Sequence, residues 1–273
     1  MNKVILITGA SAGIGKEAAK QLLQAGNVVY GAARRFDKMS DIEASGVRVL
    51  QMDVTNEQSM VAGVNSILKA EGRIDVLINN AGFGAYGAVE EVPMSEAKYQ
   101  MEVNVFGAAR LIQLVLPSMI DHHFGKIVNI SSISGKFALP LGAWYHASKF
   151  AFEALSDSLR NEVKQFGVDV IVIEPGAIKT EWANIATENL LKVSGQGRYK
   201  QMTEDFAKMI KSMDDSTAGE PKLIANLIKE VITTEQPETR YAAGYMAEEL
   251  LSMRKTMTDR EFDDMLSSLL NRK

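Results

Sequence analysis

Short apolar runs alternate with longer helical stretches over the first two thirds of the chain, and this alternation constrains the fold most. The apolar runs cover residues 3–8, 27–33, 47–54, 74–80, 126–132 and 168–176. The stretches from about Gly13 to Ala25, Glu57 to Glu71, Ser95 to His122 and Trp144 to Phe166 are typical of helices. Strands that are apolar on both faces indicate a parallel sheet with helices on both sides. The sequence therefore predicts a doubly wound α/β fold.

The last third of the chain follows a different pattern. Residues 181–239 read as helix and loop, with one clear helix from Pro221 to Thr233. Residues 239–245 suit a last short strand, and residues 247–270 suit one amphipathic helix. With 273 residues, 46% of them hydrophobic and 23% charged, the chain is expected to form one globular domain over residues 1–273.

Composition excludes several classes of protein. The net charge of −4 and the absence of a cluster of basic and aromatic residues argue against a nucleic-acid partner. No apolar run approaches the roughly 18 residues of a membrane helix, and none suits a signal peptide, so we expect a cytoplasmic protein without a membrane partner. The chain has no cysteine, which excludes disulfides and thiolate chemistry, and we expect no metal.

The stretch that follows the first predicted strand has two incompatible interpretations. Residues 9–13 read G-x-S-x-G, the turn that presents the nucleophile of α/β-hydrolases. That turn needs an earlier strand for its oxyanion hole, and His122 and His123 suit a surface cluster better than a triad or metal site. The alternative is a glycine loop, Gly9, Gly13 and Gly15, that opens a helix and faces a pyrophosphate. Taken alone, such a loop is equally consistent with a purely structural turn.

Further motifs follow the later strands. Asn79-Asn80-Ala81-Gly82 ends the fourth strand, Ser132 ends the fifth, and a Tyr-x-x-x-Lys pair, Tyr145 and Lys149, begins the next helix. Residues 175–180, PGAIKT, end the sixth strand. The carboxyl ends of parallel strands line the ligand crevice of an open sheet, so all these residues are expected at one edge.

The ordered set of TGxxxGxG, NNAG, a lone Asn in the fourth helix, Ser, YxxxK and PGxxxT strongly resembles the short-chain dehydrogenase/reductase family, over residues 3 to about 180. The resemblance implies a Rossmann-type sheet, with residues 1–180 as the cofactor-binding and catalytic core. Residues 181–239 would form a variable substrate lid, and residues 240–273 a C-terminal strand and helix. Gly195, Gly197 and the polar DDSTAG stretch also suggest that residues 181–220 form a mobile lid that ligand orders.

Tyr145 and Lys149 lie four residues apart and therefore share a helix face. An adjacent ammonium favours the phenolate, so it is expected to lower the pKa of Tyr145 towards neutrality. The alternative interpretation of this spacing is an exposed Tyr–Lys pair on the helix surface that has no function. The resemblance implies that Tyr145 is the general acid/base, that Lys149 also binds the nicotinamide ribose, and that Ser132, with Ser131 and Ser134 as neighbours, stabilises the substrate oxygen.

Asn104 matches the asparagine that, in the family, holds a water between the lysine and solvent. The alternative is a structural role, in which a buried Asn104 makes hydrogen bonds to the helix backbone. The resemblance also implies a cofactor site, whose members are Gly9, Ser11, Gly13, Ile14, Gly15, Arg34, Asp53, Val54, Asn80, Ala81, Gly82, Tyr145, Lys149, Pro175, Gly176, Ile178 and Thr180.

The second strand ends in a sequence that favours NADP(H). Ala33 stands where the acidic residue of NAD-selective sheets is expected, and Arg34 and Arg35 follow it. We expect Arg34 to be the main contact of the 2′-phosphate, with Ser11 as a helper and Arg35 as the fallback. Two arginines on a solvated loop are the alternative. Because cells usually keep NADPH reduced, carbonyl reduction is the expected direction.

Apolar residues beside the motifs indicate a hydrophobic ketone, aldehyde or alcohol as substrate. The candidates for the substrate pocket are Phe83, Phe137, Trp144 and Trp182, together with Leu190, Leu191, Tyr199 and Met202 of the lid region. The alternative is that these residues only pack in the hydrophobic core. Within the family the chain looks most like the hydroxysteroid- and retinol-dehydrogenase-like branch. A non-catalytic dinucleotide sensor or scaffold on this fold is the rival function, and a homodimer or a homotetramer is the expected assembly.

Overall fold

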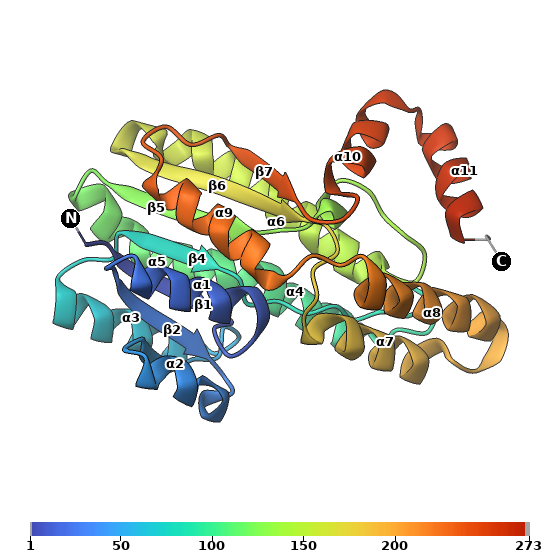
Figure 1. The fold of residues 1–273 in the computed structure, drawn as a ribbon, viewed down its shortest axis with the longest axis horizontal. Coiled ribbons are helices and arrows are strands. Elements are labelled where there is room, and N and C mark those ends of the chain that lie inside the picture. Colours follow the sequence, from blue (N-terminus) through green and yellow to red (C-terminus); the bar gives the residue numbers. More distant parts are fainter. Residues whose placement is uncertain (1, 271–273) are drawn as a thin grey trace.

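The computed structural model describes residues 2–270, apart from the side chains of residues 214, 215, 269 and 270, and its centre is a seven-stranded parallel sheet (Figure 1). The strand order is β3-β2-β1-β4-β5-β6-β7. The strands are β1 (Val4–Thr8), β2 (Val28–Ala33), β3 (Arg48–Gln51), β4 (Val76–Asn79), β5 (Gly125–Ile130), β6 (Val168–Pro175) and β7 (Arg240–Ala243). The predicted doubly wound sheet is confirmed; residues 1 and 271–273 of the predicted domain lie outside the described residues.

Two apolar layers, one on each face of the sheet, explain why the strands are apolar throughout. In β1, Ile5 and Ile7 belong to one buried cluster, whereas Val4 and Leu6 belong to the other. Successive side chains of a strand point to opposite faces, so a strand covered on both sides has no polar face.

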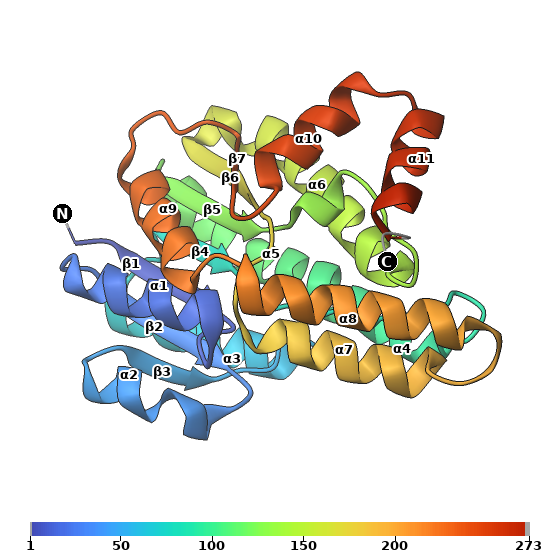
Figure 2. The same ribbon diagram turned by 45° about the vertical axis from the view of Figure 1, so that its right-hand side comes forward.

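Helices cover both faces and extend beyond the sheet (Figures 1 and 2). The helices are α1 (Gly13–Gln24), α2 (Ser40–Ala44), α3 (Glu57–Glu71), α4 (Met94–Met101), α5 (Gly107–Asp121), α6 (Ala143–Val163), α7 (Glu181–Ser194), α8 (Lys200–Ser216), α9 (Pro221–Thr233), α10 (Ala247–Thr256) and α11 (Asp259–Leu270). Residues of α1, α2 and α9 supply one apolar layer, and residues of α3, α5 and α6 supply the other. The helix α9, inside the predicted lid region, is therefore part of the core.

The helix predicted from Ser95 to His122 is continuous but contains a π-helical turn at Glu102–Phe106, between α4 and α5. The helix spans 28 residues, Met94–Asp121, and its most apolar 18-residue window has a mean hydropathy of 1.5, so by length and composition it could cross a membrane. Half of the most apolar window is buried inside the protein. The prediction concerned unbroken apolar runs, and this helix is interrupted by polar residues such as Asn104, Arg110 and Gln113, as expected for a helix whose apolar face covers the sheet.

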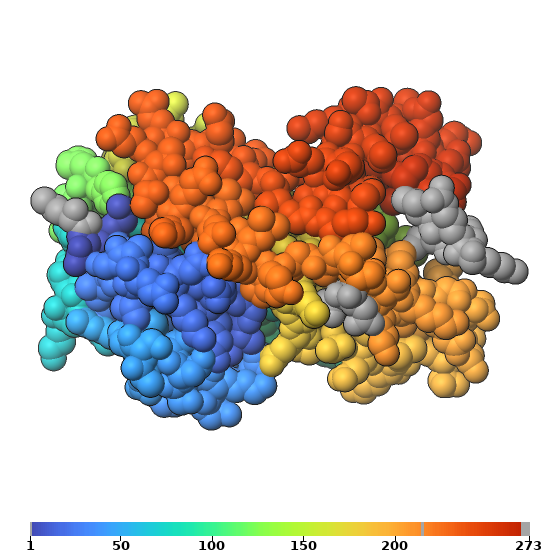
Figure 3. Space-filling model, in the orientation of Figure 1, coloured from blue at the N-terminus to red at the C-terminus, as the bar shows by residue number. Residues whose placement is uncertain are grey.

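Two groups of helices rise beyond the carboxyl ends of the strands. In Figure 3, α7 and α8 (yellow to orange) form one lobe, and the red C-terminal helices form another. The prediction of one helix over residues 247–270 was wrong, since the chain breaks between α10 and α11. At Thr258, the backbone N–H and the hydroxyl both donate to the Glu261 carboxylate, at 2.9 and 2.7 Å, and the Glu261 N–H donates back to that hydroxyl. This reciprocal cap starts a new helix.

Candidate active site

The glycine loop after β1 is built around Asn80. Gly9 has φ +70° and Gly13 has φ +54°, which is left-handed backbone that glycine adopts without strain. A Cβ atom on Gly9 or Gly15 would lie 2.8 or 2.5 Å from Asn80 Nδ2. That amide donates to the Thr8 carbonyl oxygen at 3.0 Å, and the Thr8 hydroxyl accepts from the N–H groups of Asn80 and Ala81. The NNAG segment thus holds the loop close to the neighbouring strand.

A single cavity of about 780 Å³ begins at this loop and continues beneath α7 and α8. The helix α1 starts at Gly13 without a side-chain cap, so its first N–H groups are available to an anion. The glycine cradle and the uncapped helix fit a pyrophosphate. Every predicted cofactor-binding residue lines the cavity except Gly15, which packs against Asn80 and the Gly9 carbonyl instead.

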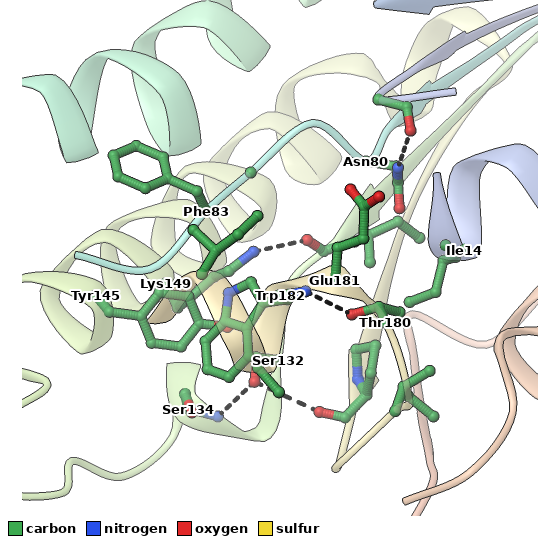
Figure 4. A pocket seen from close by; sticks show the side chains of 18 of the residues that line it. Ile14, Asn80, Phe83, Ser132, Ser134, Tyr145, Lys149, Thr180, Glu181 and Trp182 are labelled. Carbon is green, nitrogen blue, oxygen red and sulfur yellow. Dashed lines mark hydrogen bonds between the residues drawn. The ribbon is translucent and has the colours of Figure 1, made fainter. Parts of the chain in front are cut away.

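Ser132, Tyr145 and Lys149 also line this cavity, and Figure 4 shows their side chains close together. The Ser132 hydroxyl donates to the Pro175 carbonyl at 3.4 Å and accepts from the Ser134 N–H at 3.1 Å. Lys149 Nζ donates to the Ile130 carbonyl at 2.9 Å and lies 5.9 Å from the centre of the Tyr145 ring. These contacts bring together side chains from the turn after β5 and from α6 in one apolar-walled site.

Burial dominates the electrostatics of the pair. It raises the pKa of Tyr145 to about 12, although the hydrogen bond with Ser132 acts in the opposite direction. Burial also lowers the pKa of Lys149 to about 8, while the nearby Glu153 carboxylate raises it. The expectation that Lys149 would lower the pKa of Tyr145 is therefore not met in this structure, because the loss of water around the phenol is the largest effect and only the Ser132 hydrogen bond opposes it.

Asn104 lies on the π-helical turn and not at the cavity wall. Its amide donates to the Phe83 carbonyl and the Ser148 hydroxyl, both at 3.0 Å, and its Oδ1 accepts from the Phe83 N–H at 3.1 Å. The side chain therefore joins the loop after β4 to α6. π-Helical turns are frequent at functional sites, and the water-holding role of Asn104 stays a prediction.

The two arginines after β2 take different partners. Arg34 Nη1 donates to the Tyr99 hydroxyl at 2.5 Å. Arg35 donates to the Ser11 hydroxyl at 3.2 Å and to the Glu181 carboxylate at 2.7 Å, and Lys38 donates to the same carboxylate at 3.2 Å. Hydrogen bonds from these two cations lower the pKa of Glu181. Glu181 is the first residue of α7, so this ion pair connects the lid to the cofactor end of the cavity.

The part of the cavity near Tyr145 is lined by apolar and aromatic residues, and these include only some of the residues predicted for a substrate pocket. Phe83, Phe137 and Trp182 line the cavity, whereas Trp144 does not. Trp144 precedes Tyr145 on α6, and adjacent residues of a helix point about 100° apart, so only one of them faces the cavity. In the lid, Leu190 is buried in an apolar cluster, while Leu191 and Met202 are exposed and Tyr199 donates to Glu90.

Several residues of the site were missed by the sequence analysis. The Tyr86 ring lies 5.6 Å from Tyr145 and packs edge-on against Trp182. The remaining missed residues line the cavity from the lid and the C-terminal segment; they are Phe206, Met209, Ile210, Met213, Met246, Leu250 and Leu266. Periodicity predicts a buried face for such residues but not which cavity that face borders.

His146 is a further missed residue, and it positions the loop that carries Ser132. Its Nε2 accepts from the Leu139 N–H and its Nδ1 donates to the Ser134 carbonyl, both at 3.1 Å. Burial lowers the pKa of His146, which favours the neutral ring that these two bonds require.

Comparison with known proteins identifies this arrangement. A model of the family described as short chain dehydrogenase matches residues 3–190. The chain belongs to the short-chain dehydrogenase family. A 3-ketodihydrosphingosine reductase of Bacteroides thetaiotaomicron is 35% identical over 256 residues, which are 93% of this chain and 92% of that protein. A short-chain dehydrogenase of Streptomyces avermitilis shares the whole fold, with a TM-score of 0.85, 31% identity and full coverage of both chains.

A metagenomic short-chain oxidoreductase in complex with NADP is also similar, with a TM-score of 0.70 and 28% identity over 88% of this chain and 96% of that one. Family membership makes the protein an oxidoreductase that uses a nicotinamide dinucleotide and acts on a small molecule.

Proposed function

We propose that this short-chain dehydrogenase is an NADP(H)-dependent enzyme that interconverts a hydrophobic ketone or aldehyde and the corresponding alcohol, with Tyr145 as general acid/base. One observation carries the proposal. Ser132, Tyr145 and Lys149 line the same cavity as the glycine cradle, and the walls beyond them are apolar. A sensor or scaffold would not need this combination of groups.

In the direction of reduction, Tyr145 donates the proton that the carbonyl oxygen acquires. Its raised pKa suits this role, since the phenol keeps its proton at neutral pH until charge develops on the substrate oxygen. The Ser132 hydroxyl donates a hydrogen bond to the same oxygen and so stabilises that charge. A bound nicotinamide dinucleotide supplies the hydride.

Lys149 contributes a buried positive charge beside the phenol. The ammonium favours the phenolate that remains after proton transfer, and its N–H groups suit the hydroxyls of a nicotinamide ribose. Because the pKa of Lys149 is lowered to about 8, the charge is present at neutral pH and is lost as the pH rises through that value. Carbonyl reduction is expected to decline over the same range.

The preference for NADP(H) rests on the charge at the end of β2. Ala33 is buried and carries no carboxylate, whereas Arg34 and Arg35 line the cavity there. Among the described residues, the one side-chain partner of Arg34 is the neutral Tyr99 phenol, so Arg34 can turn to a 2′-phosphate without breaking an ion pair. Similar solved structures contain NADP in some cases and NAD in others, so the choice depends on these local charges.

The substrate class follows from the cavity walls and from one relative. The rings of Tyr86 and Trp182 pack against Tyr145, Phe206 packs against Tyr86, and the methionines of α8 extend the apolar surface. The name of the Bacteroides relative specifies reduction of a keto group on a sphingosine skeleton. We therefore expect the carbonyl of an extended hydrophobic molecule to reach Tyr145.

A substrate panel tests the proposal. Linear, steroidal and aromatic ketones are offered with NADPH or NADH, and cofactor oxidation is followed by absorbance. Tyr145→Phe should bind NADPH normally and keep less than about a tenth of the wild-type turnover. Tyr241→Phe, which removes a hydroxyl that accepts a backbone N–H far from the cavity lining, is the matched control. Binding of NADPH without turnover of any ketone or alcohol would favour a sensor, and an active Tyr145→Phe would refute the role of the phenol.

A further inference from the structure

The C-terminal helices contribute a wall to the apolar part of the cavity. Met246 and Leu250, at the start of α10, line the cavity, and so does Leu266 on α11. The family model matches residues 3–190, so this wall lies in a part of the chain that the model does not cover. The groups proposed for the chemistry all lie within the matched part.

Two apolar clusters adjoin at the candidate catalytic residues. One contains Tyr145 together with residues of α7 and α8, and the other contains Ile133 together with Leu266 of α11. Leu139 packs against both clusters. Ile133 directly follows Ser132 in the chain, so the two hydroxyls proposed to contact the substrate oxygen belong to opposite sides of this junction. The carbon skeleton attached to that oxygen is therefore expected to lie between the two clusters.

The wall on α8 is an extended apolar stripe. Its cavity-lining residues are Phe206, Met209, Ile210 and Met213, at the spacing i, i+3, i+4 and i+7 of one helix face. This spacing covers about 10 Å of helix. An extended chain advances by about 3.5 Å for every three bonds, so the stripe matches about nine bonds of an alkyl chain. The unbranched methionine side chains adapt to a flexible ligand.

A buried aromatic contact holds α11 in place. The Phe262 ring lies 5.5 Å from the Phe137 ring, and the Arg254 guanidinium lies 5.6 Å from the centre of the Phe262 ring. Leu266 follows Phe262 by about one turn and is 7% exposed. Within the described residues of α11, Leu266 is the one that lines the cavity. The helix also contacts α8, and Figure 2 shows the two helices on the same side of the molecule.

The start of α10 is fixed to the end of β6. The Gly176 N–H donates to the Ala243 carbonyl at 2.8 Å, and the Ala177 N–H donates to the Tyr245 carbonyl at 3.4 Å. Met246 then has φ 59°, a left-handed conformation that residues other than glycine rarely adopt. Such strain persists only where the surrounding contacts enforce it. The wall formed by α10 and α11 is therefore tied to the same segment that borders the cofactor site.

We propose that α11 determines the chain length of the substrate: the alkyl chain of an unbranched ketone or alcohol lies along α8, and Leu266 meets the end of that chain. The proposal rests on the proposed function, because it concerns the substrate of the same site. Each further methylene that leaves water strengthens binding until the chain reaches Leu266. A longer chain has to displace a packed side chain or remain in water, so it gains nothing further.

Straight-chain methyl ketones, from methyl butyl ketone to methyl dodecyl ketone, test the proposal in the full-length protein. Binding is measured by isothermal titration calorimetry with the oxidised dinucleotide present, which cannot reduce a ketone, and kcat/KM is measured with the reduced one. In the wild type, each added methylene should raise the affinity about fourfold up to a break at one chain length. Leu266→Trp should move this break to a chain about two carbons shorter, and Leu266→Ala to one about two carbons longer.

Leu251→Ala is the matched control, because Leu251 packs in the same apolar cluster but does not line the cavity. It should lower thermal stability and leave the break at the wild-type chain length. An affinity that does not depend on chain length, or a break at the same length in wild type and both Leu266 variants, would overturn the proposal. A fused-ring ketone that binds more tightly than every straight-chain ketone would also overturn it. If one Leu266 variant does not fold, the direction of the shift in the other decides.

The two measurements separate this proposal from the proposed function. If no ketone is reduced while the break in binding still follows residue 266, the proposed function fails and the role of α11 stands. If ketones are reduced but the break is the same in every variant, the proposed function stands and the role of α11 fails.

Discussion

Replacing Arg34 with alanine is the sharpest test of the cofactor preference. Arg34 lines the cavity directly after Ala33, and its guanidinium is bonded to the Tyr99 hydroxyl alone among its described side-chain partners. Arg35 is bonded to Ser11 and Glu181. A 2′-phosphate can therefore engage Arg34 by displacing a neutral phenol, whereas engaging Arg35 requires an ion pair to open.

The expected magnitudes differ accordingly. A hydrogen bond to a charged group contributes about 1.5–3 kcal/mol, so Arg34→Ala should weaken NADPH roughly tenfold to hundredfold. The Arg35–Glu181 pair joins side chains that are 43% and 45% exposed, and exposed pairs are worth about 0.2–1 kcal/mol. Glu181→Gln should thus free Arg35 and strengthen NADPH by at most about fivefold. It should also restore part of the affinity that Arg34→Ala loses.

The assay is the ratio of kcat/KM with NADPH to kcat/KM with NADH, together with direct binding of both cofactors. NADH lacks the 2′-phosphate, so its binding should change little in either variant. Arg198→Ala removes an exposed arginine at the start of α8 and controls for general charge effects. A wild type that prefers NADH, or an Arg34→Ala ratio within twofold of the wild type, would refute the assignment. Ala33→Asp should shift the preference towards NADH.

Three further predictions concern the lid, the C-terminal helices and acid stability. Limited proteolysis should cut first within residues 195–219 and more slowly when NADPH and substrate are bound, because ligand contacts hold the lid closed; equal rates would contradict a ligand-ordered lid. Thr258→Ala should lower the free energy of unfolding by about 1 kcal/mol in urea, whereas Thr256→Ala, whose hydroxyl bonds only its own helix, should have less effect. The lowered pKa of His146 means that the unfolded chain takes up its proton first, so stability should fall as the pH drops below about 6.5. Urea midpoints at several pH values should show a smaller acid loss in His146→Gln than in His122→Gln.

The sheet and most of its helices could be predicted because their signal is local. The strands are apolar on both faces, and a strand buried on both sides needs no information from distant residues. The break between α10 and α11 was also readable, since Thr258 and Glu261 stand at the spacing of a capping box. The apolar periodicity continues across this break, so periodicity alone predicts a single helix.

The candidate catalytic residues were predictable because their spacing is part of the proposed chemistry, but their environment was not. Tyr145 and Lys149 share a helix face whatever surrounds that face. The pKa of Tyr145 depends on how much water the fold removes, and that depends on Tyr86, Trp182 and Phe206, which lie 59, 37 and 61 residues away along the chain. Likewise, Glu153 reads as an ordinary helix residue until β6 and β7 bring Glu174 and Arg240 against it.

The lid marks the limit of what periodicity can decide. An amphipathic helix such as α8 has one apolar face, and Met202 and Met209 are both apolar residues within it, yet Met202 is 50% exposed and Met209 lines the cavity. The difference lies in where α8 meets α7, because Phe206 and Ile210 are buried in the cluster that also holds Leu190. That contact fixes the rotation of α8 about its axis and turns Met209 and Met213 towards the cavity. The sequence of a helix specifies which of its residues share a face. Only the packing partner specifies what that face borders. The shape of the cavity is therefore determined by the packing of α7 against α8 more than by any motif.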